Sequence, residues 1–218
     1  LSLHDALPIS GDVQAAREHL REGARRHRAI GGHVGEALSL QRLAELHQHE
    51  GRHAEARALI DEALDLARQT DIGFHLLDRI YGTRITLHAD RPEAALHVLE
   101  DASASVRGPL ETCPGCRITF AVPAAIAAAR AGEVELAEQH ETQCAYLADV
   151  VMRLPAWHAA HNEVRGHIAA ARRQATDDTV ARFAAAAAQF RAAGQPVDAA
   201  RCERLAMEAA LGGRSHLV

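Results

Sequence analysis

One spacing of small residues recurs along the chain and restricts the folds open to it. In the best copies a Gly or Asp is followed five residues later by Ala, then by an aliphatic residue and a second small residue. The first alanines of successive copies are 40, 39, 42 and 44 residues apart, at Ala16, Ala56, Ala95, Ala137 and Ala181. A period near 40 residues predicts stacked helix pairs, because one such unit cannot bury its apolar face alone.

The composition fits helices that approach closely. Aromatic residues make up only 3% of the chain while 48% is hydrophobic, so the core must be built from Ala, Leu, Val and Ile. We therefore expect an all-α fold, a right-handed solenoid of antiparallel helix pairs. The apolar spacing predicts helices over residues 12–29, 34–49, 52–69, 73–88, 91–104, 115–130, 133–150, 155–173, 177–193 and 196–211. Pro123 lies inside one of them and should kink it.

The domain organisation follows from the same repeat. The opening stretch LSLHDALPIS, residues 1–10, has no initiator Met and is expected to be a non-native leader, and a natural chain would continue before it. Residues 11–211 form one helical-repeat domain. A long connector over residues 105–113 divides it into sub-arrays 11–104 and 114–211, and residues 212–218 form a tail.

The residues at the helix contacts resemble a known repeat family. In the best copy Ala44, Gly51, Ala56, Ile60 and Ala63 stand at the spacing of tetratricopeptide repeats, in which small residues occupy the contact points and a turn separates the helices. The family's aromatic at the end of the first helix and its terminal Pro are replaced or absent here. The resemblance is specific for the fold and much less so for function.

A second resemblance lies near the end of the chain. The pattern F-x3-G-x-P-x2-A-A-R is common in MalT-like and other large bacterial transcriptional regulators, and it is matched by Phe190, Gly194, Pro196, Ala199, Ala200 and Arg201. This likeness implies a non-catalytic module for protein–protein interaction or effector sensing, cut from such a regulator. Its partner would be a protein or peptide, or a small effector, bound on the concave face.

The repeat phase indicates which side chains face that groove. They mix apolar and polar character, although packing against a missing N-terminal repeat would explain the apolar members equally well. The expected partner-binding residues are Leu38, Gln41, Glu45, Gln48, Leu77, Ile80 and Arg84.

The motif TCPGC leaves three interpretations open. Cys113 and Cys116 lie at a predicted helix start, the place where redox-active C-x-x-C pairs lie, but no strand precedes them as in thioredoxin-like units. They could also supply two of four zinc ligands, with zinc as the only cofactor implied. In an antiparallel pair that turns near residues 131–132, Cys144 returns to within roughly 4.5 Å of rise of Cys116.

The following helix would bring His161, or alternatively His158, to the same level, whereas His140 is the weaker candidate. The expected metal set is therefore Cys113, Cys116, Cys144 and His161. Against it, Cys144 occupies the small-residue position of its repeat, where buried Cys behaves as a small hydrophobe. A metal-binding or thiol redox-sensing protein is the alternative function.

Other classes of function fit the sequence poorly. A formal net charge of −5 with dispersed basic residues argues against a broad nucleic-acid-binding face in this segment. We find no Gly-rich phosphate loop, G-x-S-x-G elbow or H-E-x-x-H, and expect no catalytic residue and no enzyme activity. The lack of a secretory leader or a long apolar run predicts a cytoplasmic protein that does not contact membrane.

Overall fold

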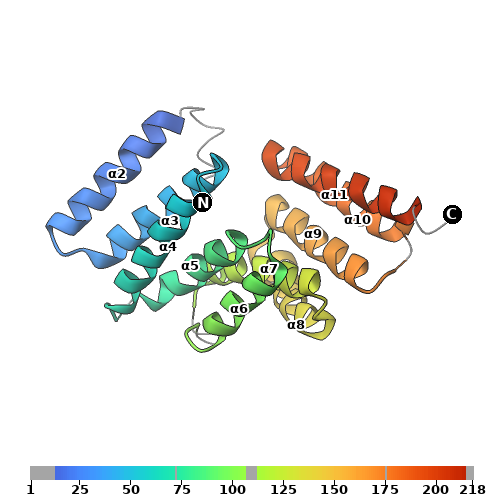
Figure 1. The fold of residues 1–218 in the computed structure, drawn as a ribbon, viewed down its shortest axis with the longest axis horizontal. Helices are drawn as coiled ribbons and strands as arrows, with labels where there is room; N and C mark the ends of the chain where they lie inside the picture. The colour runs from blue at the N-terminus through green and yellow to red at the C-terminus, as the bar shows by residue number, and fades with distance from the viewer. Residues whose placement is uncertain (1–12, 72, 107–111, 175, 215–218) are drawn as a thin grey trace. The chain divides into compact units, whose positions relative to one another are not determined.

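The computed structural model describes residues 13–71, 73–106, 112–174 and 176–214 (Figure 1). Within these ranges all regular secondary structure is helical, so the all-α prediction is confirmed. The predicted leader, residues 1–10, lies outside the described residues, as does most of the connector. The helices are α2 (Val13–Ala29), α3 (His33–His49), α4 (His53–Arg68), α5 (Phe74–Thr86), α6 (Pro92–Ser103), α7 (Pro114–Ala131), α8 (Val134–Ala145), the π-helix η1 (Tyr146–Met152), α9 (Pro155–Ala171), α10 (Thr176–Ala192) and α11 (Pro196–Arg214).

Helix ends are set by Gly and Pro at the predicted turns. Gly51 follows α3 with a φ of 77°, and Gly132 and Gly194 end α7 and α10 in the same left-handed region. At each of these ends the next amide donates to the carbonyl five residues back, as Arg52 N does to His47 O at 2.8 Å. Pro92, Pro155 and Pro196 begin their helices, where a missing N–H costs nothing. The predicted boundaries are therefore matched to within a few residues.

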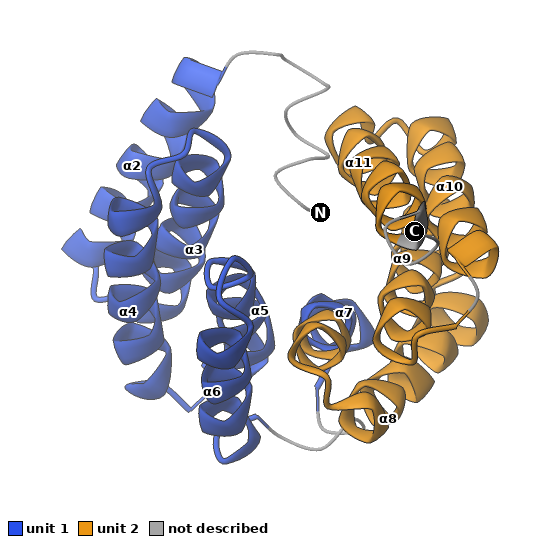
Figure 2. Cartoon of the chain, turned by 45° about the vertical axis from the view of Figure 1, so that its right-hand side comes forward, with its two compact units in different colours: residues 1–123 blue, residues 124–218 orange. Residues whose placement is uncertain are grey.

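The chain divides into two compact units, residues 1–123 and 124–218 (Figure 2). The division falls inside α7, directly after the helix-internal Pro123. Each unit has its own packed core and is described separately below. The sub-arrays 11–104 and 114–211 stay an interpretation of the repeat.

In unit 1 each helix from α2 to α6 packs on the next, and α3 also contacts α5. The small residues of the repeat lie at these contacts: Ala44 and Ala56 are completely buried, as are Ile60 and Ala63. Because Ala at such points lets two backbones approach, the recurring Ala spacing and the burial have one cause. Gly82 of α5 serves the same purpose, since its Cα faces the backbone of Thr119 at the start of α7.

In unit 2, α8 packs on α9, α9 on α10 and α10 on α11. The predicted helix 133–150 is present, but its end winds as the π-helix η1 and stops where Arg153 takes a φ of 50°. Helix α11 begins within the pattern F-x3-G-x-P-x2-A-A-R, residues 190–201, which we call the closing motif. None of the described helices is long and apolar enough to cross a lipid bilayer.

The closing motif holds α9, α10 and α11 together. Gly194 supplies the turn, Pro196 begins α11, and the guanidinium of Arg201 lies 5.9 Å above the ring of Phe190. The same guanidinium donates two hydrogen bonds of 2.7 Å to the buried carboxylate of Glu163 on α9. The motif is thus a packing device in this chain.

Candidate functional site

The predicted groove residues of unit 1 take part in a polar strip between α3 and α5. Gln41 Nε2 donates to Thr83 Oγ1 at 2.9 Å and to Glu45 Oε1 at 2.6 Å. Thr83 in turn donates to Glu45 at 3.3 Å, and Gln48 Nε2 reaches the carbonyl of Thr86 at 3.4 Å. One helical turn separates each of these α3 residues from the next, so their side chains lie in a row along α3.

The seven predicted partner-binding residues divide by exposure. Leu38 is 38% exposed, and Glu45, Gln48 and Arg84 keep part of their surface accessible. Gln41, Leu77 and Ile80 are instead buried in the packing of unit 1. A partner can touch the first four without rearranging the unit, whereas the other three support the surface from below.

Sequence reasoning missed the α5 side of this strip. Thr83 and Thr86 were not singled out, although they supply the hydroxyl and carbonyl that bind Gln41 and Gln48. A signal was present, because the two threonines stand three residues apart on α5, next to the predicted Arg84. Arg84 itself extends toward Asp61, 3.4 Å away on α4.

The two cysteines of TCPGC come together at the start of α7. Their Sγ atoms are 2.7 Å apart as free thiols, and the amide of Cys116 donates to Cys113 Sγ at 3.3 Å. Cys113 is exposed and Cys116 is buried. Burial raises the pKa of Cys116, an effect that Arg79 Nε opposes from α5 at 3.4 Å. An accessible thiol thus lies beside a shielded one.

A buried ion pair lies next to this thiol pair. Arg117 and Asp78 are 3.4 Å apart, with 4% and 0% of their side chains exposed. Desolvation raises the pKa of Asp78, and the charge of Arg117 acts against that rise. The Arg117–Asp78 pair joins α5 to the first turns of α7 by charge. Within α7, the Arg117 guanidinium also lies 5.7 Å from the ring centroid of Phe120.

The other two predicted metal ligands lie in unit 2. Cys144 is completely buried, and burial followed by the charge of Glu141 raises the pKa of its thiol far above the ordinary range. His161 faces two carboxylates: its Nε2 is 2.7 Å from Glu141 and its Nδ1 is 3.2 Å from Asp149. Both acids were missed by the sequence analysis, which considered only His and Cys as ligands.

Among the residues that the structure describes, no three His, Cys, Asp or Glu side chains are arranged to hold a metal ion. The structure brings Cys113 and Cys116 together in unit 1, and it places Cys144 and His161 in unit 2. The four-residue zinc set stays a prediction.

The acid–histidine cluster borders a cleft of about 500 Å³ in unit 2. Asp149 lies 2.7 Å from His158 Nδ1 and 3.2 Å from His161 Nδ1, so one carboxylate of η1 faces two histidines of α9. Asn162 and Gln189 close another side of the cleft through a hydrogen bond of 2.8 Å. These groups satisfy one another and fix the junction of η1 with α9.

Comparison with known proteins identifies a fold and no family. No protein-family model matches the chain, and no curated protein matches it. Among solved structures it is similar to BtubC (BKLC) from P. vanneervenii, at 17% sequence identity and a TM-score of 0.54 over 92% of this chain and 91% of that one. At this identity the similarity concerns the fold alone.

Proposed function

We propose that this chain is a non-catalytic helical-repeat module that binds a protein or peptide segment, or a small effector, as part of a bacterial transcriptional regulator. The observation that carries the proposal is the polar strip between α3 and α5, in which Glu45 and Gln48 are held by neighbouring side chains yet remain partly exposed. Exposed Leu38 lies on the same helix. Fixed polar groups beside an apolar side chain suit recognition of an extended or helical peptide.

The proposal includes a finer architecture, a right-handed tetratricopeptide-like solenoid of antiparallel helix pairs with a period of about 40 residues. Support comes from the packing of each helix on the next in both units, and from the contact of α3 with α5. That contact joins the first helices of two successive repeats, which is where solenoids of helix pairs present their binding surface. Burial of three of the five recurring Ala positions, Ala56, Ala95 and Ala137, agrees with it, whereas Ala181 is exposed.

In this role the module works in the cytoplasm and touches neither nucleic acid nor membrane directly. The net charge of −5 argues against direct contact with nucleic acid, because an acidic chain without a basic stripe would repel a phosphate backbone. DNA contact would then belong to another domain of the regulator.

A peptide selection tests the proposal. A displayed library of random peptides is selected on the immobilised chain, and the affinities of the selected peptides are measured by calorimetry. We expect Gln48→Arg and Arg84→Glu to weaken binding at least about tenfold, because Gln48 is a partly exposed member of the strip and Arg84 is a partly exposed predicted groove residue next to Thr83 on α5. Asp65→Arg, a change at an exposed position of α4, should leave affinity unchanged. Failure to select any peptide, or equal affinity in all variants, would contradict the proposal.

The thiol pair supports a second candidate, a peroxide-responsive sensor. The exposed Cys113 thiolate would attack hydrogen peroxide to give a sulfenic acid and hydroxide, and the Cys116 thiol would then displace the hydroxyl of the sulfenic acid as water to form a disulfide. The 2.7 Å separation of the two sulfurs favours this step, because the second thiol is already in place.

Peroxide treatment followed by mass spectrometry tests this candidate. We expect a loss of about 2 Da per chain, the two hydrogens removed by disulfide formation, in the wild type and in Cys144→Ser, and none in Cys113→Ser. Elemental analysis of the untreated chain tests zinc in parallel: about one zinc per chain, lost in Cys113→Ser/Cys116→Ser, would favour the metal-binding alternative.

A further inference from the structure

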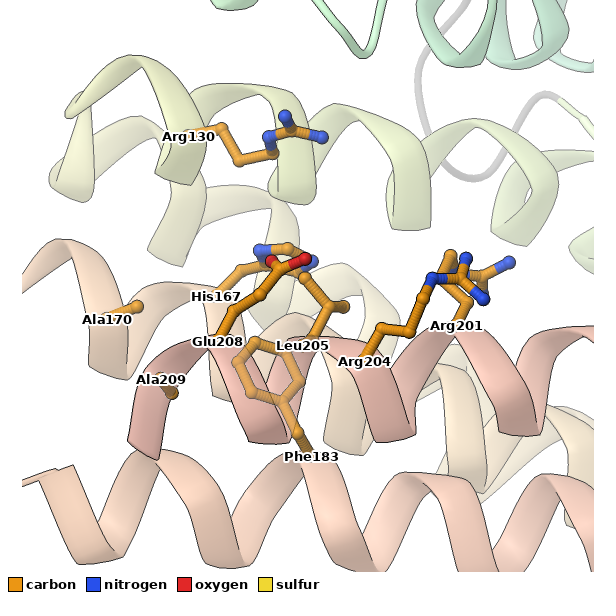
Figure 3. Close-up of a pocket in the computed structure, with 9 residues that line it drawn as sticks. All are labelled: Arg130, His167, Ala170, Phe183, Arg201, Arg204, Leu205, Glu208 and Ala209. Atoms are coloured by element: carbon orange, nitrogen blue, oxygen red, sulfur yellow. The ribbon is translucent and has the colours of Figure 1, made fainter. Parts of the chain in front are cut away.

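Unit 2 contains a cavity whose lining includes no residue of the polar strip or of the thiol pair. It has a volume of about 440 Å³ and lies among the end of α7, α9, α10 and α11 (Figure 3). This volume lies in the range of small-molecule sites in proteins. Every residue that lines it belongs to residues 124–218, so the site is complete within one unit.

Part of the cavity wall is apolar and well ordered by packing. Phe183 meets the ring of His167 edge-on, with centroids 5.1 Å apart. The ring fits because residue 166 is Gly: a Cβ there would come within 2.6 Å of Phe183. Leu205 of α11 adds a further apolar side chain. A ligand with a flat or aliphatic body can therefore leave water on this side of the cavity.

His167 is a buried polar group that points to a ligand. It is 9% exposed and lines the cavity, and neither ring nitrogen has a hydrogen-bond partner in the described part of the chain. Burial lowers the pKa of His167 to about 4, with Glu163 opposing the shift and Arg130 and Arg201 adding to it. At neutral pH the ring is uncharged and offers one N–H donor and one acceptor.

Three arginines line the same cavity, and they differ in how their charge is compensated. Arg201 is bound by Glu163 at 2.7 Å and by Asp198 at 2.5 Å. Arg130 and Arg204 are exposed, and no carboxylate among the described residues lies within ion-pair distance of either. Figure 3 shows that these two side chains come from different helices, α7 and α11.

We propose that this cavity binds a small organic anion, with its carboxylate or phosphate held by Arg130 and Arg204 and its apolar body against Phe183 and Leu205. Guanidinium groups bind such oxygens through paired N–H donors, and two arginines without acidic partners offer more of these than one carboxylate can take. The His167 ring donates its N–H to the ligand. Glu208, the one acid among the lining residues, takes a hydroxyl or amine at another part of it.

This inference deepens the effector-sensing part of the proposed function and rests on it for its role in the cell. The anion would supply the negative partner that Arg130 and Arg204 lack, and it would join the end of α7 to α11. Binding is expected to stabilise unit 2, because only the folded unit brings together the four helices that line the cavity.

Calorimetry with simple probes tests the site on the full chain. Phenyl phosphate and benzoate carry both an anion and an apolar ring, inorganic phosphate carries only the anion, and benzylamine replaces the anion by a cation. We expect saturable binding of at least one ring-bearing anion with a Kd below about 1 mM, weaker binding of inorganic phosphate, and none of benzylamine. A preference between phenyl phosphate and benzoate then distinguishes phosphate ligands from carboxylates.

Matched substitutions locate the binding. Arg130→Gln and Arg204→Gln should each weaken it at least about tenfold. Arg173→Gln, at an exposed arginine outside the cavity, should leave it unchanged. Circular dichroism checks that the variants are folded, which is expected because both cavity arginines are exposed. Absence of saturable binding, or equal affinity in all variants, overturns the inference.

Measuring anion binding and peptide binding on the same variants distinguishes this inference from the proposed function. Loss of anion binding in Arg204→Gln with peptide binding intact places the two activities at different sites. If no anion binds while peptides do, the inference fails and the peptide-binding function stands. If anions bind but no peptide is selected, the cavity is the only ligand site supported.

Discussion

The carboxylate of Glu163 on α9 accepts two hydrogen bonds from the guanidinium of Arg201 on α11, each 2.7 Å long. The acid is 3% exposed and the arginine side chain 40%. Desolvation by itself would lower the pKa of Arg201, but the charge and hydrogen bonds of Glu163 outweigh it and raise the pKa above its ordinary value. The pair therefore joins the first and last helices of the α9–α11 stack as a fixed ionic contact.

Removing one partner of this pair should destabilise unit 2. We expect Arg201→Leu to lower the free energy of unfolding by roughly 2 kcal/mol, less than a fully buried pair would lose because the arginine is half exposed. The cause is the Glu163 carboxylate, which is left buried without a counter-charge. Urea unfolding followed by circular dichroism measures the change, and Glu163→Leu/Arg201→Leu should recover most of it.

A surface pair on the neighbouring helices provides the control. Arg191 and Glu203 also join α10 to α11, but the side chains are 62% and 44% exposed, so neither charge is buried. Arg191→Leu should change the free energy of unfolding by less than about 0.5 kcal/mol, since exposed ion pairs contribute little. Equal losses in Arg191→Leu and Arg201→Leu would show that burial of Glu163 does not govern the effect.

A methyl group at Gly82 should disturb the contact of α5 with α7. A Cβ at this position would collide with the carbonyl oxygen of Thr119 and come within 3.0 Å of its carbonyl carbon. Because backbone cannot move aside as a side chain can, Gly82→Ala should cost about 1–3 kcal/mol despite its better helix propensity. Gly212→Ala, with no atom within 4 Å, should be neutral or slightly stabilising. A thermal melt of both variants decides the matter, and an unchanged melting temperature in Gly82→Ala would contradict the close contact.

His167 should make the free energy of unfolding depend on pH. Its folded-state pKa of about 4 is below its ordinary value of 6.5, so between these values the unfolded chain binds more protons than the folded one. Stability should therefore fall as the pH drops from about 6.5 to 4, by about 3 kcal/mol in total from this residue. Urea unfolding at several pH values in that range measures the effect. The free energy of unfolding should change less with pH in His167→Gln than in the wild type, and as much as in the wild type after His97→Gln, at an exposed position.

The four cysteines should differ in reactivity toward a thiol reagent. Cys113 is exposed, whereas Cys144 and Cys202 are completely buried and burial raises the pKa of Cys202 to about 12. We expect rapid native-state labelling that Cys113→Ser abolishes, and labelling of Cys144 and Cys202 only after unfolding. Fast modification of Cys144 in the folded protein would contradict its placement in the core.

Sequence spacing was sufficient for the helices but not for the groove. The apolar period and the Gly and Pro positions are local properties, and they located every described α-helix to within a few residues. Exposure is not local: Gln41 and Ile80 stand in the same repeat phase as accessible residues, yet contacts from neighbouring helices bury both. The winding of residues 146–152 as a π-helix also has no counterpart in the apolar pattern.

By itself the sequence determined the all-helical fold, because a recurring Ala, Leu and Gly pattern specifies which face of each helix is buried and where it ends. It also marked Cys113 and Cys116 as neighbours, since three residues bring two side chains to one turn of a helix. Only the tertiary structure paired Glu163 with Arg201, 38 residues apart, and grouped Arg130, His167 and Arg204 around one cavity. Such groupings depend on the distances between packed helices, which are set by the volumes of all the side chains between them and not by any local spacing.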